Sequence, residues 1–180
     1  SDLESAMFGT KINDAFVQVR AGGDIAFLYA VAKLMVERGW YDADFVANHT
    51  QGFAELQAHL SSLSYVALEA ESGVPFAQVE AYAAMLRDAK TAIFVWGMGI
   101  TQHTTGEENV HAIVNLALLK GFVGREGCGL MPIRGHSNVQ GIGSMGVTPK
   151  LRDAVLQSLE REYGVQVPTM PGLDTLGCME

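Results

Sequence analysis

Residues 91–105 read TAIFVWGMGITQHTT, and this stretch says more about the fold than any other part of the chain. It opens with a nearly continuous apolar run of strand length, Thr91–Trp96, which Gly97 ends. A run without polar alternation is typical of a strand that is covered on both faces, as in a parallel sheet. The segment Gly97–His103 then predicts a loop at the carboxyl end of that strand.

A capped helix is predicted after this loop. Thr104 with Glu107, and Thr105 with Glu108, both match the S/T-x-x-E capping box that marks a helix N-terminus. Apolar residues then recur at helical spacing and should form the inner face: Val110, Ile113, Val114, Ala117 and Leu118. Gly121 ends the helix. Strand, Gly-x-Gly loop and capped helix make half of a βαβ unit, in which ligands bind at the carboxyl end of the strand.

Two common nucleotide-binding motifs do not occur. The dinucleotide fingerprint G-x-G-x-x-G would need a third glycine where the sequence has Gln102. The P-loop pattern G-x-x-x-x-G-K-[ST] is not found anywhere in the chain. An ordinary NAD site or P-loop is therefore not supported.

The rest of the chain reads mainly as helix, so the predicted class is α/β. Asp24 is placed to cap the first helix, and residues 25–32 are apolar on every side, which predicts a buried helix. The predicted helices are Asp24–Arg38, Asp42–Asn48, Phe53–Leu60, Pro75–Ala89 and Lys150–Tyr163. The Pro75 helix should bury an inner stripe of Phe76, Val79, Ala83 and Leu86. Little looks periodic between Phe122 and Thr148.

Composition excludes several classes of protein. The 180 residues are 48% hydrophobic and 18% charged, which excludes a disordered chain. Twelve basic and twenty acidic residues give a net charge of −8, which argues against a general binder of nucleic acid or anionic membranes. Two cysteines cannot form a disulfide framework, and the longest apolar run, Ile25–Ala32, is too short to span a membrane.

Glycines and acids are unevenly distributed. Eight of the twenty glycines lie in residues 121–146, whereas no acid occurs between Glu126 and Asp153 or between Asp88 and Glu107. Glycine lets a backbone approach a ligand closely, and missing carboxylates avoid repelling an anion that backbone N–H groups would hold. Two partly buried loops that simply lack charges are the alternative. The two segments together favour an anion site.

Arg134 is the only charged residue between Glu126 and Lys150. A guanidinium without an acidic neighbour in sequence favours an external anion such as phosphate or carboxylate. A salt bridge to an acid distant in sequence is the alternative. No histidine spacing matches a metal site, and Cys128 is interpreted as a buried small hydrophobe, with a reactive thiol as the alternative.

Four segments carry a resemblance to a known family. VWGMGITQH (residues 95–103) resembles a W-x-M-G-x-x-Q loop, and RGHSNVQG (134–141) is similar to an R-G-x-x-N-V-Q-G segment. The helix with Asn109, Asn115, Leu116 and Leu119 continues the match into GREGCG (124–129), and GGDIA (22–26) stands where relatives have a P-G-T-D-x-A-like element. Together they resemble the molybdopterin oxidoreductases, of the formate dehydrogenase and dimethyl sulfoxide reductase type.

The resemblance implies a fold and a domain division. It runs from about Phe8 to Pro149 and implies an incomplete Rossmann-like αβα lobe. Residues 1–149 are expected to form part of the domain that binds the pterin cofactor. Residues 150–180 are expected to form a helix and a tail that lead into the next domain. Both chain ends are interpreted as cuts in a longer polypeptide. Some apolar surface of this chain is therefore expected to contact domains that lie outside the sequence.

The resemblance also implies a cofactor and site residues. The family binds molybdenum or tungsten through two molybdopterin guanine dinucleotides. The residues expected to contact this cofactor are Gly22, Gly23, Asp24, Gly97, Met98, Gly99, Thr101, Gln102, Gly135, Ser137 and Asn138. Asp24 would accept hydrogen bonds from guanine. Arg134 and His136 are the expected catalytic residues, with a small oxyanion or carboxylate such as formate as the substrate. His136 departs from formate dehydrogenases, which resemble R-G-Q at this point.

Other parts of the enzyme are expected outside this sequence. The metal-ligating Cys or selenocysteine and any iron–sulfur cluster should lie upstream of it, so no residue here is predicted to bind the metal. The partners expected are the pterin cofactor, the small substrate and the remaining domains, without nucleic acid or a membrane span. The isolated chain should be inactive, and a cytoplasmic location is the default. A non-catalytic α/β module that binds nucleotide or protein is the alternative.

Overall fold

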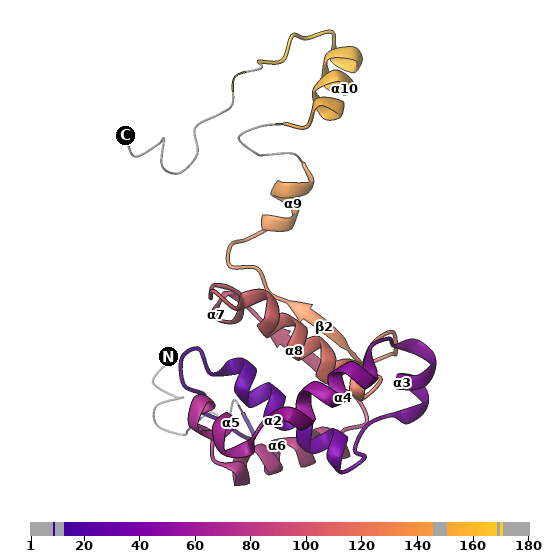
Figure 1. Ribbon diagram of the computed structural model, residues 1–180. Coiled ribbons are helices and arrows are strands. Elements are labelled where there is room, and N and C mark those ends of the chain that lie inside the picture. Colours follow the sequence, from indigo (N-terminus) through magenta and orange to yellow (C-terminus); the bar gives the residue numbers. More distant parts are fainter. Residues whose placement is uncertain (1–8, 10–12, 146–150, 169, 171–180) are drawn as a thin grey trace. The chain divides into compact units, whose positions relative to one another are not determined.

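The structure is a computed structural model that describes residues 9, 13–145, 151–168 and 170 (Figure 1). The chain divides into two compact units, Ser1–Ile133 and Arg134–Glu180. The expected domain boundary after residue 149 lies outside the described residues and stays a prediction. Within the described residues, no helix is both long and apolar enough to cross a membrane.

The first unit is built around α2, which is almost completely buried. Its bounds are Asp24–Glu37, and Val31 and Met35 have no exposed surface. Burial of each large apolar side chain contributes about 1.5–3 kcal/mol, so this helix forms the centre of the core. The helices that contact α2 are α4 (Phe53–Ser62), α5 (Tyr65–Ser72), α6 (Phe76–Asp88) and α8 (Gly106–Leu119). The predicted burial of this segment is confirmed, and α5 is a helix that the sequence patterns did not predict.

The start of α2 differs from the prediction. Gly23 occupies the N-cap position, and Asp24 is the first helical residue, so the expected Asp24 cap is wrong. A Cβ atom on Gly23 would lie 2.8 Å from both the Glu71 carbonyl oxygen and the Ser72 Cα atom. The close packing of the α2 start against the end of α5 therefore requires glycine at this position.

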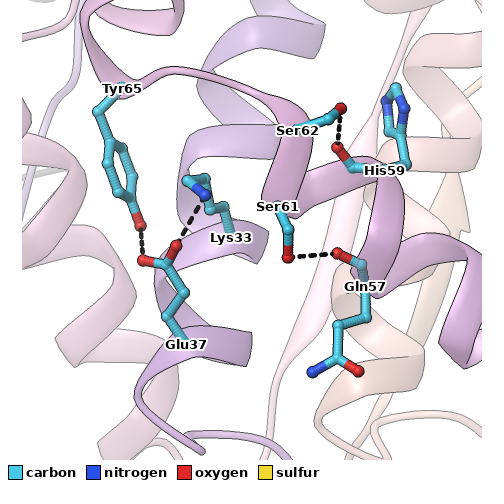
Figure 2. Close-up of polar contacts among 7 residues, drawn as sticks. All are labelled: Lys33, Glu37, Gln57, His59, Ser61, Ser62 and Tyr65. Carbon is cyan, nitrogen blue, oxygen red and sulfur yellow. Dashed lines mark hydrogen bonds and ion pairs between the residues drawn. The ribbon is translucent and has the colours of Figure 1, made fainter.

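A group of three polar side chains fastens α5 to α2 (Figure 2). Lys33, which is buried, forms an ion pair of 2.7 Å with Glu37, and the Tyr65 hydroxyl donates a hydrogen bond of 2.7 Å to the same carboxylate. The hydrogen bond from Lys33 holds the pKa of Glu37 below its ordinary value. Burial, and then the Glu37 carboxylate, raise the pKa of Tyr65. The buried ammonium is thus paired, as a charge in a protein core must be.

Two parallel strands and two helices form the βαβ unit. Strand β1 (Ile93–Trp96) is followed by α7 (Met98–Thr101), α8 and β2 (Gly129–Pro132). The strands pair in parallel, with Ile93 opposite Gly129 and Trp96 opposite Pro132. The predicted α/β class and parallel sheet are confirmed. The sequence patterns did not predict β2.

Among the described residues, the helices of the first unit cover one face of the sheet. Phe94, Trp96 and Leu130 pack against the core, and successive residues of a strand point to opposite faces. On the other face, Ile93, Val95 and Met131 are 56%, 49% and 47% exposed. Within the described residues of the first unit, the expected cover on both faces is found on one face alone, because the helices of this unit pack against that face.

The predicted helix after the loop also needs correction. Thr105 is the N-cap of α8 but makes no side-chain capping hydrogen bond, and its backbone is not extended as a capping residue usually is. The predicted capping boxes are therefore wrong. The predicted inner face is only partly right, because the buried residues of α8 are Gly106, Asn109, Ala112, Ile113, Leu116, Ala117 and Leu119. Packing on α2 selects this stripe, which includes a polar asparagine.

The remaining helices fall close to their predicted bounds. Helix α3 spans Ala43–His49, and Asp42 caps it by accepting a hydrogen bond of 2.9 Å from the Phe45 amide. In α6, Val79, Ala83 and Leu86 are buried and Phe76 packs at the core edge, as predicted. The second unit contains α9 (Val139–Ser144), which was not predicted, and α10 (Asp153–Tyr163). The predicted α10 start at Lys150 lies outside the described residues.

Candidate functional site

The Gly97–Gln102 segment lies directly after β1, at the carboxyl end of the parallel sheet. It forms one short helical turn rather than the predicted open loop. The Ile100 amide donates a hydrogen bond of 3.1 Å to the Gly97 carbonyl, and the Gln102 amide donates one of 2.8 Å to the Met98 carbonyl. This turn, which we call the cofactor loop, is where a ligand is expected in a βαβ unit.

The two glycines of the cofactor loop face open space. A Cβ atom on Gly99 would meet nothing within 4 Å, and one on Gly97 would meet only the Ile133 carbonyl oxygen, at 3.6 Å. Packing among the described residues therefore does not require glycine at either position. Glycine at such places allows a ligand to approach the backbone closely.

The side chains of Met98 and Gln102 lie together on the surface of the loop. The Gln102 Nε2 atom donates a hydrogen bond of 3.6 Å to the Met98 sulfur. Met98 is 44% exposed, and both Thr101 and Gln102 are exposed as well. The three predicted contact side chains of this loop are therefore accessible to a ligand.

The main chain of the loop is contacted by three residues that follow it in the sequence. Sequence reasoning did not identify them as site residues. The buried Asn109 side chain donates a hydrogen bond of 2.9 Å to the Ile100 carbonyl. His103 Nε2 lies 2.7 Å from the Gly99 carbonyl oxygen. Buried Gly106 packs against Thr101. No local pattern in the sequence marks them, because these contacts arise from the packing of α8 against the loop.

Asp24 shares a groove with the end of β1. The groove has a volume of about 940 Å³. Its lining includes Asp24, Phe27, Trp96, Ile100 and Ile113. The structure thus brings the predicted guanine-binding carboxylate and Ile100 of the cofactor loop to one groove. Gly22 is exposed, whereas Gly23 is buried by its packing on α5.

The Arg134–Asn138 segment belongs to the second unit, so its position relative to the cofactor loop is not determined. Arg134, Gly135, His136 and Ser137 are all exposed. The Arg134 guanidinium donates a hydrogen bond of 3.5 Å to Gln140 Oε1, and no carboxylate partner is recorded for it among the described residues. Asn138 has a positive φ of 55° and is the N-cap of α9.

Part of the glycine-rich segment has a local explanation. Gly121, Gly124 and Gly127 have φ values of 63°, 73° and 72°. Other residues seldom adopt this left-handed conformation, so turn geometry accounts for these three glycines. The ligand interpretation rests on the remaining glycines and on the missing acids.

Comparison with known proteins assigns the family. The family model for molybdopterin oxidoreductase matches residues 4–168. The chain belongs to the molybdopterin oxidoreductase family. The family is named for oxidoreductases, and it implies a molybdenum or tungsten pterin cofactor.

Relatives in bacteria support this assignment. The chain is 34% identical over 177 residues to an uncharacterized oxidoreductase of Mycobacterium tuberculosis, covering 95% of this chain and 23% of the relative. It is 36% identical over 181 residues to protein YdeP of Escherichia coli, covering 95% and 24%. It is 34% identical over 172 residues to YrhE of Bacillus subtilis, provisionally named a formate dehydrogenase, covering 91% and 18%. The chain thus spans about a fifth to a quarter of these relatives.

A solved structure supports the fold. Acetylene hydratase from Pelobacter acetylenicus matches with a TM-score of 0.61 over 64% of this chain and 16% of that chain. The sequence identity is 19%, so the match concerns the fold alone. The predicted Rossmann-like lobe of a molybdopterin oxidoreductase, incomplete in this chain, is confirmed.

Proposed function

We propose that this chain holds part of a molybdenum or tungsten bis(molybdopterin guanine dinucleotide) cofactor in a larger oxidoreductase. One observation carries the proposal: Gly97 and Gly99 stand at the carboxyl end of a parallel strand, and none of the described residues packs closely enough there to require glycine. No acid occurs between Asp88 and Glu107, so no carboxylate near in sequence repels the cofactor phosphates.

The residues of the cofactor loop fit this ligand. Backbone N–H groups at a turn can hold phosphate or pterin oxygens, and exposed Met98, Thr101 and Gln102 supply further contacts. The Asp24 carboxylate would accept hydrogen bonds from the N–H groups of guanine. Gly22 and Gly23 lead into that contact, and Gly135, Ser137 and Asn138 are proposed as additional contacts from the second unit. When bound, the metal cofactor supplies two-electron redox chemistry.

Arg134 and His136 are the proposed catalytic residues. The planar guanidinium of Arg134 would bind the two oxygens of a small carboxylate or oxyanion, and it has no carboxylate partner recorded among the described residues. The His136 side chain is exposed and can exchange a proton near neutral pH. We propose that Arg134 orients the substrate and that His136 takes up or releases a proton beside it.

Formate is the first substrate to test. The provisional name of YrhE favours it. However, His136 stands where formate dehydrogenases resemble glutamine, and a histidine can transfer a proton whereas glutamine cannot. The proposed substrate class is therefore a small carboxylate or oxyanion, with formate as its simplest member.

The test uses the full-length parent protein. Metal analysis should find molybdenum or tungsten, and denaturation should release guanine nucleotide in a fixed ratio to the metal. The full-length parent should catalyse the reduction of an artificial electron acceptor by formate. A parent that contains neither metal would overturn the proposal and favour a non-catalytic α/β module. A loaded parent that does not oxidise formate would exclude formate and leave the cofactor role intact.

A further inference from the structure

Residues that follow the cofactor loop meet three consecutive carbonyl groups: two accept side-chain hydrogen bonds, and the third lies close against the start of α8. Gly99, Ile100 and Thr101 supply the carbonyls. The residues that meet them are His103, Asn109 and Gly106, spaced three residues apart in sequence. One side of the loop is thereby fixed against the start of α8.

Asn109 makes the most informative of these contacts. Its side chain is 2% exposed and lies in the apolar stripe of α8, yet its Nδ2 atom donates a hydrogen bond of 2.9 Å to the Ile100 carbonyl, nine residues earlier. A buried amide that binds one main-chain oxygen favours a single loop conformation, because other conformations leave both groups without a partner. Helix packing alone would be served by leucine or alanine.

Gly106 and His103 act on the neighbouring carbonyls. A Cβ atom on Gly106 would overlap the Thr101 carbonyl oxygen, so only glycine lets the first turn of α8 approach the loop this closely. His103 Nε2 lies 2.7 Å from the Gly99 oxygen. A protonated His103 Nε2 donates a hydrogen bond to the Gly99 carbonyl, and His103 precedes α8 in the sequence. His103 thus holds one carbonyl oxygen, and Gly106 allows α8 to pack against the next part of the loop.

We propose that His103, Gly106 and Asn109 are positioning residues that set the shape of the cofactor loop for its ligand. The inference rests on the proposed function, because it assumes that the loop binds the pterin guanine dinucleotide. Carbonyl oxygens carry partial negative charge and would repel the cofactor phosphates. Hydrogen bonds to the oxygens of residues 99 and 100 keep these two carbonyls directed away from the anion. The backbone around Gly97 and Gly99 then remains open to the ligand.

The first experiment measures the loop without cofactor. In the cofactor-free full-length parent, Asn109→Ser shortens the side chain and removes the hydrogen bond to Ile100. Amide hydrogen exchange in the peptide covering residues 98–106 should become about five times faster or more, because a buried hydrogen bond is lost. Asn115→Ser is the matched control, since Asn115 lies on the same helix and has no recorded contact with the loop. Exchange in that peptide should not change in the control.

The second experiment measures binding. Cofactor content per folded protein, taken as metal and released guanine nucleotide, should fall several-fold in Asn109→Ser and in His103→Ala, but not in Asn115→Ser. His103→Gln retains an N–H donor and should restore most of the content. A merely structural role would lower the melting temperature of these variants without lowering cofactor content per folded protein.

The outcomes separate the two proposals. Unchanged exchange at residues 98–106 in Asn109→Ser would overturn the positioning role, whatever the cofactor is. Faster exchange with unchanged cofactor content in a loaded parent would overturn its link to the ligand. A wild-type parent without the cofactor would overturn the proposed function, while the exchange measurement would still test the loop. If Asn109→Ser does not fold, the His103 pair supplies the same two measurements.

Discussion

The first turn of α8 packs directly on the cofactor loop, because Gly106 has no side chain to separate it from Thr101. A Cβ atom at Gly106 would lie 2.8 Å from the Thr101 carbonyl carbon and 3.1 Å from its Cα atom. Both neighbours are backbone atoms, so no flexible side chain can move aside. This contact joins the helix that packs on α2 to the loop at the carboxyl end of β1.

Gly106→Ala should therefore destabilise the protein and displace the loop. Overpacking of a closely packed site costs about 1–3 kcal/mol, which should lower the melting temperature of the full-length parent. Gly129→Ala is the control, because a Cβ atom at Gly129 meets nothing within 4 Å. Equal melting temperatures for Gly106→Ala and the wild type would contradict the packing role.

Gly99→Ala should have the opposite combination of effects. A Cβ atom at Gly99 meets no protein atom within 4 Å, so the melting temperature of the cofactor-free parent should change by little. Cofactor content should fall by about tenfold or more, because the methyl group occupies space that a closely bound ligand needs. Metal analysis and guanine release measure the content. Normal content would show that the ligand does not approach Gly99.

Arg134→Lys in the parent should reduce turnover more than cofactor content. Lysine keeps the positive charge but loses the planar pair of donors that binds both oxygens of a carboxylate, a loss worth about tenfold or more in kcat/KM. Arg161→Lys is the control, because Arg161 is exposed and pairs with its neighbour Glu162. Steady-state kinetics and metal content are measured on the same samples. Unchanged turnover would remove Arg134 from the substrate site.

Stability should depend on the ionisation of Glu37. Its pKa is lowered in the folded protein, mainly by the hydrogen bond from Lys33. A lowered acid pKa contributes stability above the unfolded value, near 4.5, and that contribution is lost as the pH falls through the folded value. Because the Glu37 side chain is partly exposed, this ion pair contributes only about 0.2–1 kcal/mol to the free energy of unfolding. Glu37→Gln should flatten the dependence of the melting temperature on pH below the unfolded value, near 4.5. An unchanged pH profile in that variant would contradict it.

The uncovered face of the sheet should make the isolated 180-residue chain self-associate. Ile93, Val95 and Met131 form an exposed apolar surface on adjacent strands. Exposed apolar surface of this kind marks an interaction site. Sedimentation should show association that weakens in Val95→Thr, which keeps β-branching but adds a hydroxyl. A monodisperse wild-type chain would contradict this prediction.

Much of the first unit could be predicted from local patterns. Local apolar patterns predicted three elements: the apolar run of β1, the segment of α2 that is apolar on all sides, and the apolar stripe of α6. In each, the spacing of the apolar residues reflects which side chains are buried. Local patterns failed where packing decided. Gly23 rather than Asp24 caps α2, because the α5 backbone lies too close for a side chain at that position.

Strand β2 shows why other parts could not be predicted. Its four residues, Gly129–Pro132, begin with glycine and end with proline, both of which are rare in strands. The segment is a strand because its backbone pairs with β1, more than thirty residues earlier in the sequence. Pairing over such a distance leaves no periodic pattern in the short segment itself.

The sequence by itself determined the family and the α/β class, because the motifs and the apolar runs are local properties of the chain. It also indicated where negative charge is absent. Only the tertiary structure decided which glycines serve packing and which face open space. Gly106 and Gly99 look alike in the sequence, yet a Cβ atom on Gly106 would overlap the Thr101 backbone, whereas one on Gly99 would meet none of the described atoms within 4 Å. That difference arises from atoms brought together by folding, so composition and spacing cannot reveal it.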